Sequence, residues 1–245
     1  MFIREDEKID EIGFGGLKLI QSSEGFRYGV DAVVLADFAA TLATGGRRVF
    51  DLGTGSGVIP LILSHKMPKS VITGVELQRD SAERAERNVA LNGLGNRIKI
   101  INSDIKDLKK GYRAAADIVV SNPPYMEKGS GLIGVDGAKA AARHETTAVL
   151  KDFFITASHL LDKRGEFFLV HRPYRLADIF CYARETGFEA KTMRLVCPME
   201  GREPNIVLVH FIKGAGKQLK VLKNLDVHTP NGSYTEEIDR IYERR

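Results

Sequence analysis

Residues 47–57 read Arg-Arg-Val-Phe-Asp-Leu-Gly-Thr-Gly-Ser-Gly, and this stretch decides the fold. Its first half has the apolar character of a buried strand, and its second half is a glycine-rich turn. Residues 58–65 then have the composition of a helix. A strand, a glycine loop and a helix in this order form the first crossover of an open α/β sheet. We therefore expect a ligand site at the carboxyl end of this strand.

Strand and helix patterns alternate through the rest of the chain. Further strands are expected at residues 71–76, 98–101, 117–121, 165–171, 191–197 and 205–213, and helices at 32–42, 78–92, 146–161 and 174–186. Seven strands separated mainly by helices predict a doubly wound, mostly parallel α/β sheet. No long helix fits between Cys197 and Asn205, so the last strand is expected to be antiparallel.

The length of 245 residues fits a single domain with small annexes. Residues 1–30 are expected to form an N-terminal annex with a hairpin that turns at Gly15-Gly16, and residues 31–213 the core of the domain. Asp31 is expected to cap the first helix of that core. Residues 214–245 form a C-terminal extension, which is expected to end in a short helix from Thr235.

Composition limits the cellular setting. The formal net charge of +4 permits a polyanionic partner without requiring one. No apolar run approaches the roughly 18 residues of a membrane span, and the N-terminus has no secretory pattern, so a cytoplasmic protein is expected. Cys181 and Cys197 are too few for a disulfide framework or a zinc site, and we expect both to be reduced.

Residues 121–125 read Ser-Asn-Pro-Pro-Tyr and follow the apolar run of residues 118–120. Two consecutive prolines lack N–H donors, so a central strand must end here. Asn122 and Tyr125 are thereby held at the carboxyl edge of the sheet, where open α/β folds bind ligands. The Asn122 amide oxygen, the Pro123 carbonyl and the Tyr125 ring can together hold a flat group that carries an NH2. Taken alone, the segment is also compatible with an ordinary strand-ending turn.

The glycine loop departs from the dinucleotide-binding fingerprint, whose third glycine would fall at Val58. Its pattern, Asp51-x-Gly53-x-Gly55-x-Gly57, instead resembles motif I of class I S-adenosylmethionine-dependent methyltransferases. An acidic residue at position 51 would repel a pyrophosphate but suits a cationic amino-acid group.

Two further strand ends fit the same cofactor. Glu76, which ends the second strand of the core, is placed to accept hydrogen bonds from both ribose hydroxyls. Asp104 follows the third strand and is placed to accept a bond from the adenine amine, while Ile105 donates its backbone N–H. A glycine triplet alone is weak grounds for a cofactor site, but the triplet followed by strand-end acids in this order is specific.

These features together resemble the class I methyltransferases that act on amino groups, and imply their Rossmann-like fold. Within that class the chain is most similar to the bacterial valine-tRNA adenine-N6 methyltransferase family, which modifies the adenosine directly 3′ of the anticodon. Four segments carry the closer resemblance, which extends over nearly the whole chain: residues 26–31 (Phe-Arg-Tyr-Gly-Val-Asp), 121–125, 142–144 (Ala-Arg-His) and 232–235 (Gly-Ser-Tyr-Thr).

The resemblance implies S-adenosyl-L-methionine as cofactor and a tRNA as partner, without a metal or a membrane; the oligomeric state is not predicted. Cofactor-binding residues are expected at Arg27, Tyr28, Asp31, Asp51, Gly53, Thr54, Gly55, Gly57, Glu76, Leu77, Asp104, Ile105 and Asn122. The expected catalytic residues are Asn122, Pro123, Pro124 and Tyr125, with Tyr125 stacked on the base. The tRNA phosphates are expected to meet Lys128, Lys139, Arg143 and His144.

Three alternatives stay open at this point. The same Asn-Pro-Pro-Tyr motif occurs in methyltransferases that act on guanine N2 of ribosomal RNA and on a glutamine amide of release factors, because amine and amide present the same planar NH2. The glutamine enzymes carry a separate helical N-terminal domain, whereas only about thirty residues precede the first expected helix here. A cofactor-sensing RNA-binding protein without catalytic activity is the third alternative.

Overall fold

The computed structural model describes residues 3–22, 28–45, 47–125 and 148–244. The strands are β1 (Glu7–Gly13), β2 (Leu17–Ser22), β3 (Arg48–Leu52), β4 (Val71–Glu76), β5 (Ile98–Asn102), β6 (Ala116–Ser121), β7 (Leu161–His171), β8 (Phe188–Met199), β9 (Ile206–Lys213), β10 (Lys220–Val221) and β11 (Leu225–His228). The helices are α1 (Val30–Leu42), α2 (Val58–Lys66), α3 (Arg79–Leu91), α5 (Leu150–Leu160), α6 (Leu176–Glu185) and α7 (Glu236–Ile241), with the 3₁₀ turns η1 (Ile105–Lys110) and η2 (Pro173–Arg175).

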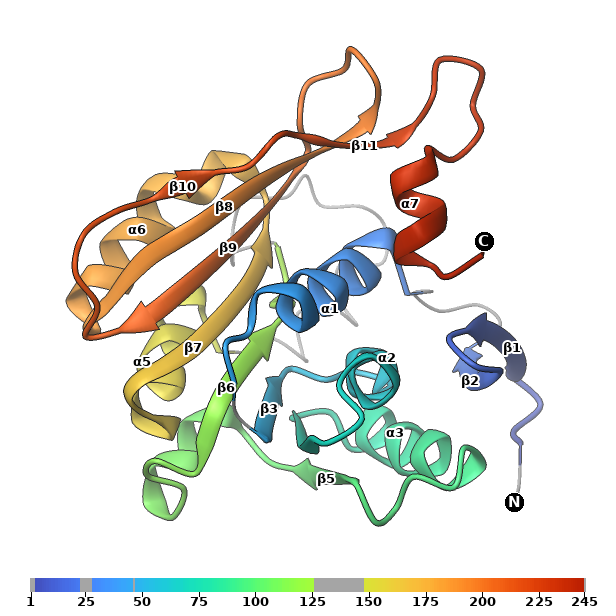
Figure 1. The fold of residues 1–245 in the computed structure, drawn as a ribbon. Coiled ribbons are helices and arrows are strands. Elements are labelled where there is room, and N and C mark those ends of the chain that lie inside the picture. The colour runs from blue at the N-terminus through green and yellow to red at the C-terminus, as the bar shows by residue number, and fades with distance from the viewer. Residues whose placement is uncertain (1–2, 23–27, 46, 126–147, 245) are drawn as a thin grey trace, which may run out of the picture.

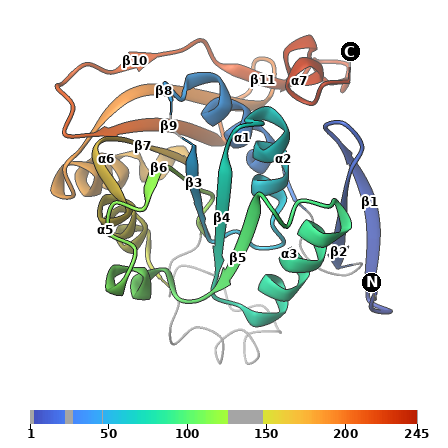
Figure 2. The same ribbon diagram turned by 60° about the horizontal axis from the view of Figure 1, so that its bottom comes forward.

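The main sheet has the order β10-β8-β9-β7-β6-β3-β4-β5, with β11 paired to β8 (Figures 1 and 2). All seven strands expected in the core are present, and β9 runs antiparallel to both β7 and β8, which confirms the prediction for the last strand. The short strands β10 and β11 come from the C-terminal extension and bring the sheet to nine strands. Sequence patterning did not predict these two.

Helices cover both faces of the sheet because alternate strand residues point to opposite sides. On one face Val49 and Ile118 pack with α1 and α2, and both side chains are fully buried. On the other face Phe50 and Val119 pack with α5 and α6. The predicted doubly wound α/β architecture is thus confirmed, and the central strands are apolar on both sides.

The carboxyl ends of the central strands meet at one edge. Strand β3 lies between β4 and β6 and is parallel to both, so that Leu52 has Val75 on one side and Ser121 on the other. Ser121 is in turn paired with Leu169 of β7. The ends of β3 and β6 are therefore adjacent, as the sequence predicts.

The start of α1 differs from the expectation. Gly29, not Asp31, is the N-cap residue, and the prediction that Asp31 caps the helix is wrong. Asp31 lies buried in the first turn, where its Oδ1 accepts a hydrogen bond from the Ala32 amide at 2.9 Å. Its Oδ2 instead faces the hydroxyl of Tyr125, so this carboxylate links α1 to the turn after β6.

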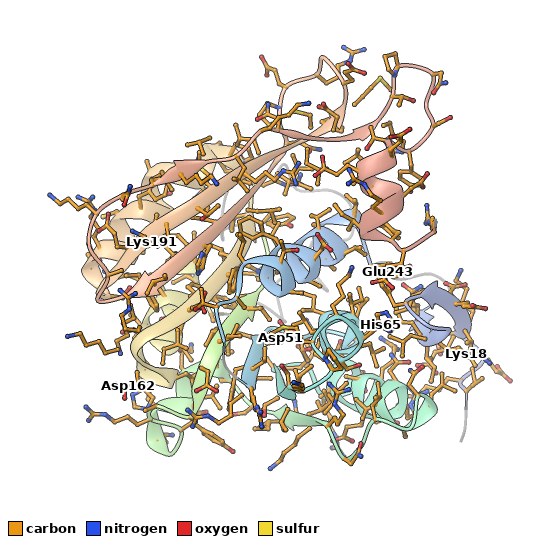
Figure 3. The ribbon with its side chains drawn as sticks, viewed as in Figure 1. Lys18, Asp51, His65, Asp162, Lys191 and Glu243 are labelled. Atoms are coloured by element: carbon orange, nitrogen blue, oxygen red, sulfur yellow. The ribbon has the colours of Figure 1, made fainter. Side chains whose placement is uncertain are left out.

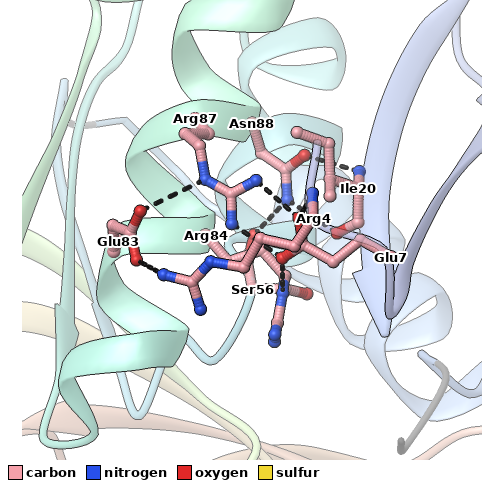
Figure 4. A network of polar contacts seen from close by, with 8 residues as sticks. All are labelled: Arg4, Glu7, Ile20, Ser56, Glu83, Arg84, Arg87 and Asn88. Atoms are coloured by element: carbon pink, nitrogen blue, oxygen red, sulfur yellow. Dashed lines mark hydrogen bonds and ion pairs between the residues drawn. The ribbon is translucent and has the colours of Figure 1, made fainter. Parts of the chain in front are cut away.

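The predicted N-terminal hairpin is present as β1 and β2, and α3 anchors it (Figure 4). The Glu7 side chain is fully buried and accepts hydrogen bonds from Arg84 Nε at 2.9 Å and from both terminal nitrogens of Arg87 at 2.7 Å. Hydrogen bonding to Arg87 lowers the pKa of Glu7 to about 2. Asn88 bonds both to the backbone of β2 and to the Ser56 carbonyl, so the hairpin is tied to the glycine loop as well.

The C-terminal extension is fixed to the core at its far end. The hydroxyl of Thr235 accepts a hydrogen bond from the Ile238 amide, so α7 begins where the sequence predicts. Glu243 then pairs with His65 at 2.8 Å (Figure 3). It also pairs with Lys66, the last residue of α2, at 3.1 Å. Within the described ranges, no helix is long and apolar enough to cross a membrane.

Candidate active site

The loop after β3 brings backbone amides to the edge of the sheet. Gly53, Gly55 and Gly57 have φ values of 76°, 56° and 84°, which side chains with a Cβ rarely adopt. A Cβ on Gly57 would lie 3.2 Å from the Cβ of Ala85, so this position also lets α3 approach the loop closely. The amides of Gly53 and Thr54 both donate to the Val75 carbonyl of β4, which fixes the loop against the neighbouring strand.

Glu76 at the end of β4 braces this loop. Its Oε2 accepts a hydrogen bond from the Gly55 amide and its Oε1 one from the Gln78 amide, both at 2.8 Å. Asn102 holds the same segment, because its side-chain amide donates to the carbonyls of Glu76 and Leu77. Each carboxylate oxygen of Glu76 keeps a second lone pair for a ribose hydroxyl. The sequence did not point to Asn102.

Asp51 is the next-to-last residue of β3, just before the loop; it lies near the middle of the view in Figure 3 and is 0% exposed. Neither of its carboxylate oxygens makes a hydrogen bond of good geometry within the described residues, although the Thr54 hydroxyl is close enough to offset part of the effect of burial on the pKa of Asp51. Burial raises the pKa of Asp51 to about 7. A buried carboxylate in this state is costly unless a cation or a hydrogen-bond donor meets it. The residues present therefore fit a ligand with an ammonium group, such as the amino-acid part of S-adenosylmethionine.

Asp104 and Ile105 lie after β5, on the far side of β4 from the glycine loop. Asp104 caps η1, since its Oδ1 accepts a hydrogen bond from the Lys106 amide at 2.9 Å. The Lys106 ammonium lies 3.3 Å from its other oxygen. Ile105 is buried. The carboxylate thus has internal partners, and the adenine contact expected for it stays a prediction.

The turn of residues 122–125 begins directly beside the glycine loop. The Ser121 hydroxyl donates a buried hydrogen bond to the Leu52 carbonyl at 2.8 Å, which ties the last residue of β6 to the last residue of β3. Pro123 is buried and Pro124 exposed, while Asn122 and Tyr125 are half-buried. The structure therefore brings Asn122 and the glycine loop together at one edge.

The Tyr125 hydroxyl links two of the predicted site residues. Its oxygen lies 2.7 Å from Asp31 Oδ2 and 2.8 Å from Asn122 Oδ1. A hydroxyl has one proton, so Tyr125 donates to one of these two acceptors at a time. Burial and the neighbouring carboxylate raise the pKa of Tyr125, which keeps the hydroxyl protonated. Asn122 Oδ1 has a further lone pair for an acceptor amine.

Residues at the end of β7 complete the surroundings of Tyr125. The guanidinium carbon of Arg172 lies 4.5 Å from the centre of the Tyr125 ring, and His171 packs against that ring nearly edge-on at 5.2 Å. The Tyr174 hydroxyl donates to the Tyr125 carbonyl at 3.3 Å. Sequence reasoning missed all three, although β7 was expected to end at residue 171 and Pro173 follows.

His171 is a neutral, buried part of this cluster. Its Nδ1 accepts a hydrogen bond from the Arg172 amide at 2.8 Å, so its Nε2 carries the proton. That Nε2 is buried without a partner within the described ranges. Burial and the charges of Arg175 and Arg172 lower the pKa of His171 to about 4. The ring therefore supports Tyr125 without carrying charge near neutral pH.

For the remaining predicted site residues, the structure does not test the expected role. Tyr28 is half-buried just before α1, and its amide donates to Gln21 Oε1 at 3.1 Å. Leu77 is 39% exposed at the end of β4. Five predicted residues lie outside the described residues: Arg27, Lys128, Lys139, Arg143 and His144.

Comparison with known sequences gives consistent matches. Residues 31–178 match the family model of the methyltransferase small domain. A relative from Porphyromonas gingivalis named tRNA1(Val) (adenine(37)-N6)-methyltransferase is 29% identical over 241 residues, which are 96% of this chain and 94% of the relative. A relative of the same name from Aeromonas hydrophila is 31% identical over 212 residues, 86% of each chain.

Solved structures share the fold. A predicted O-methyltransferase from Agrobacterium tumefaciens superposes with a TM-score of 0.69 and 24% identity, covering 87% of this chain and 95% of that one. The TYW2 protein of M. jannaschii, solved in complex with AdoMet, has a TM-score of 0.59 and 15% identity, covering 87% of this chain and 89% of that one. The described architecture is therefore one found among methyltransferases.

Proposed function

The chain belongs to the methyltransferase small domain family, and from this membership we propose that it transfers the methyl group of S-adenosylmethionine to the N6 amine of adenine 37 in a tRNA. Relatives named for that reaction align with up to 96% of the chain. The structural observation that carries the proposal is the hydrogen bond from Ser121 to Leu52, which places Asn122 beside the glycine loop.

The cofactor would be held by groups at the ends of β3, β4 and β5. The carboxylate of Asp51 suits the ammonium group, and the remaining lone pairs of Glu76 suit the ribose hydroxyls. Asp104 and the backbone of Ile105 suit the adenine. S-adenosylmethionine supplies a methyl group that is already activated, so the protein's part is to bind and to align.

The residues after β6 would orient the acceptor amine. The exocyclic amine of adenine is a weak nucleophile because its lone pair is delocalised into the ring. Asn122 Oδ1 and the Pro123 carbonyl would each accept one N6–H, which favours a tetrahedral nitrogen with its lone pair directed at the methyl group. The new N–C bond would form as the bond between the methyl carbon and sulfur breaks, which leaves S-adenosylhomocysteine, and one N6 proton would pass to solvent. Such alignment can remove several kcal/mol of entropic barrier.

An anticodon loop is a suitable substrate for this arrangement. Adenosine 37 is unpaired, so moving it into a site costs less than opening a duplex pair. The net charge of +4 permits an RNA partner. We propose that Lys128, Lys139, Arg143 and His144 contact its phosphates, as expected from their position in the sequence after the Asn-Pro-Pro-Tyr motif.

Mass spectrometry of nucleosides tests the proposal. An unmodified tRNA1(Val) transcript is incubated with the protein and S-adenosylmethionine carrying an isotopically labelled methyl group, and the RNA is digested to nucleosides. The expected product is labelled N6-methyladenosine, lost when residue 37 of the transcript is changed to guanosine. Labelled N2-methylguanosine, or no labelled nucleoside, would contradict the proposed reaction.

A further inference from the structure

Tyr174 is an exposed aromatic residue next to the candidate active site. It is 72% exposed, more than any other large hydrophobic side chain in the described ranges. Its hydroxyl donates to the backbone carbonyl of Tyr125, the last residue of the Asn-Pro-Pro-Tyr motif. Scattered exposed aromatic residues are common in soluble proteins. What sets Tyr174 apart is this bond, which places its phenol directly beside the motif.

The backbone around Tyr174 is held firmly. Tyr174 lies in η2, which begins with Pro173 directly after Arg172. Its neighbour Arg175 is buried, donates its amide to the Arg172 carbonyl at 3.1 Å and pairs with Asp178 at 2.7 Å. Tyr174 is therefore an aromatic ring on a short turn whose two sides are fixed, and little ordering is needed for it to meet a ligand.

Arg172 adds a cation to the same surface. Its guanidinium packs over the Tyr125 ring at 4.5 Å, and its Nη1 donates to the Asn205 carbonyl at 2.9 Å. Tyr125, Arg172 and Tyr174 thus form a continuous group at the ends of β6 and β7. Proteins that bind single-stranded nucleic acid combine aromatic rings with cations in this way.

We propose that Tyr174 is a stacking subsite for the nucleotide next to the target adenosine, and that Arg172 keeps the Tyr125 ring in place beside it. This inference rests on the proposed function and specifies how the RNA is held at the same site. A base on the exposed ring of Tyr174 belongs to a nucleotide that adjoins the one presented to Asn122, because the two tyrosines are in direct contact. The ligand of this subsite is an unpaired base of the anticodon loop.

Two variants of Tyr174 separate stacking from a structural role. Tyr174→Phe keeps the ring and removes the bond to Tyr125, whereas Tyr174→Ala removes both. We expect Tyr174→Ala to raise the KM for tRNA about tenfold, the size of a lost stack between one base and one aromatic ring. The kcat and the Kd for S-adenosylhomocysteine should stay within about twofold. Tyr174→Phe should match the unmodified protein.

Tyr112→Ala is a control for the loss of a tyrosine ring far from the candidate site. The Tyr112 ring packs edge-on against Phe50, and Tyr112 precedes β6, whose start lies at the opposite edge of the sheet. It should leave the KM for tRNA unchanged. An unchanged KM in Tyr174→Ala, or an equal rise in Tyr174→Ala and Tyr174→Phe, would overturn the stacking subsite.

Abasic substrates identify the stacked nucleotide. Anticodon stem-loops are made with an abasic residue at position 36 or at position 38. With the unmodified protein, one of the two abasic stem-loops should have a KM about tenfold higher than the intact stem-loop. With Tyr174→Ala, the same abasic residue should cause no further rise in KM. If the effects of the abasic residue and of Tyr174→Ala on the KM were additive, the stacking subsite would be overturned. Methyl transfer to adenosine 37 in the same experiment would still support the proposed function. Absence of any transfer by the unmodified protein would contradict the proposed function, and this inference with it.

Discussion

The two sides of the candidate site differ in how their polar groups are bonded. The cofactor side consists of Asp51, residues 53–57 and Glu76. The acceptor side consists of residues 122–125 and 171–174. On the cofactor side, the buried carboxylate of Asp51 makes no hydrogen bond of good geometry within the described residues, and Thr54 is its polar neighbour. On the acceptor side, the Tyr125 hydroxyl already contacts both Asp31 and Asn122. Under the proposed function, the first side would present the Asp51 carboxylate to the cofactor, and on the second side the Tyr125 hydroxyl would share its contacts with the substrate.

The contrast follows from the two backbones. The cofactor side is a glycine loop whose amides are fixed to β4 and to Glu76, so it offers donors and buried acids with little side-chain bulk. The acceptor side is a proline turn surrounded by large side chains from α1 and β7. We therefore expect substitutions on the cofactor side to change how the stability of the ligand-free protein depends on pH. Substitutions on the acceptor side should change the rate of methyl transfer.

The largest expected effect is on the cofactor side. Because the pKa of Asp51 is raised to about 7 by burial, the folded state binds a proton there more tightly than the unfolded state. Its contribution to stability is full at low pH and is lost as the pH rises through 7. Between pH 5 and pH 8 this loss is about 3 kcal/mol. The asparagine in Asp51→Asn cannot ionise, so this variant should not show that loss. Its free energy of unfolding relative to the unmodified protein should therefore be higher at pH 8 than at pH 5 by about the same amount.

Urea unfolding at both pH values, without cofactor, measures this difference. Asp107→Asn is the control, because Asp107 is exposed and paired with Lys110. The same Asp51 variant should bind S-adenosylhomocysteine about tenfold more weakly, since it lacks the charge that we propose meets the ammonium group. If the difference in stability between Asp51→Asn and the unmodified protein does not change with pH, the pKa of Asp51 is not raised by burial.

The next effect belongs to the acceptor side. Asn122→Ala removes the side-chain acceptor for the amine, and loss of one aligned hydrogen-bonding group in an active site costs about a hundredfold in kcat. The Kd for S-adenosylhomocysteine should stay within a few fold. Single-turnover methylation and isothermal titration measure the two quantities.

Asn96→Ala controls for the loss of an exposed asparagine, since Asn96 lies before β5 at the opposite edge of the sheet. It should leave both quantities unchanged. Undiminished turnover in Asn122→Ala would remove the acceptor role from this residue, and a large loss of cofactor affinity would move Asn122 to the cofactor side.

The features that could be predicted from sequence are those that depend on neighbours along the chain. A glycine loop after an apolar run, and prolines after another, decide where two strands end, and both predictions are confirmed. Strand β10 has two residues and β11 four, too few for a periodic pattern. These two strands pair with the edge of β8 that β9 leaves free.

Contacts between distant segments could not be predicted in this way. Asp31 has the composition and position of a helix cap, but its carboxylate contacts Tyr125, 94 residues away in the sequence. His171 and Arg172 meet Tyr125 only because β7 pairs with β6, which the order of elements alone does not specify. The sequence therefore predicted where β3 and β6 end and that these ends are adjacent, and it missed the side chains that hold Tyr125.

The smallest expected effect concerns the contact between Tyr125 and its two acceptors. Tyr125→Phe keeps a ring for the base but removes the hydroxyl between Asp31 and Asn122. Because a hydrogen bond to a charged group is worth about 1.5 kcal/mol or more, kcat should fall about tenfold while the KM for tRNA stays within about twofold. Tyr112→Phe, at the opposite edge, should change neither quantity. A rise in KM with constant kcat would mean that the Tyr125 hydroxyl contacts RNA instead of orienting Asn122 through the contacts seen here, and the acceptor side would then bind its ligand directly, as is proposed for the cofactor side.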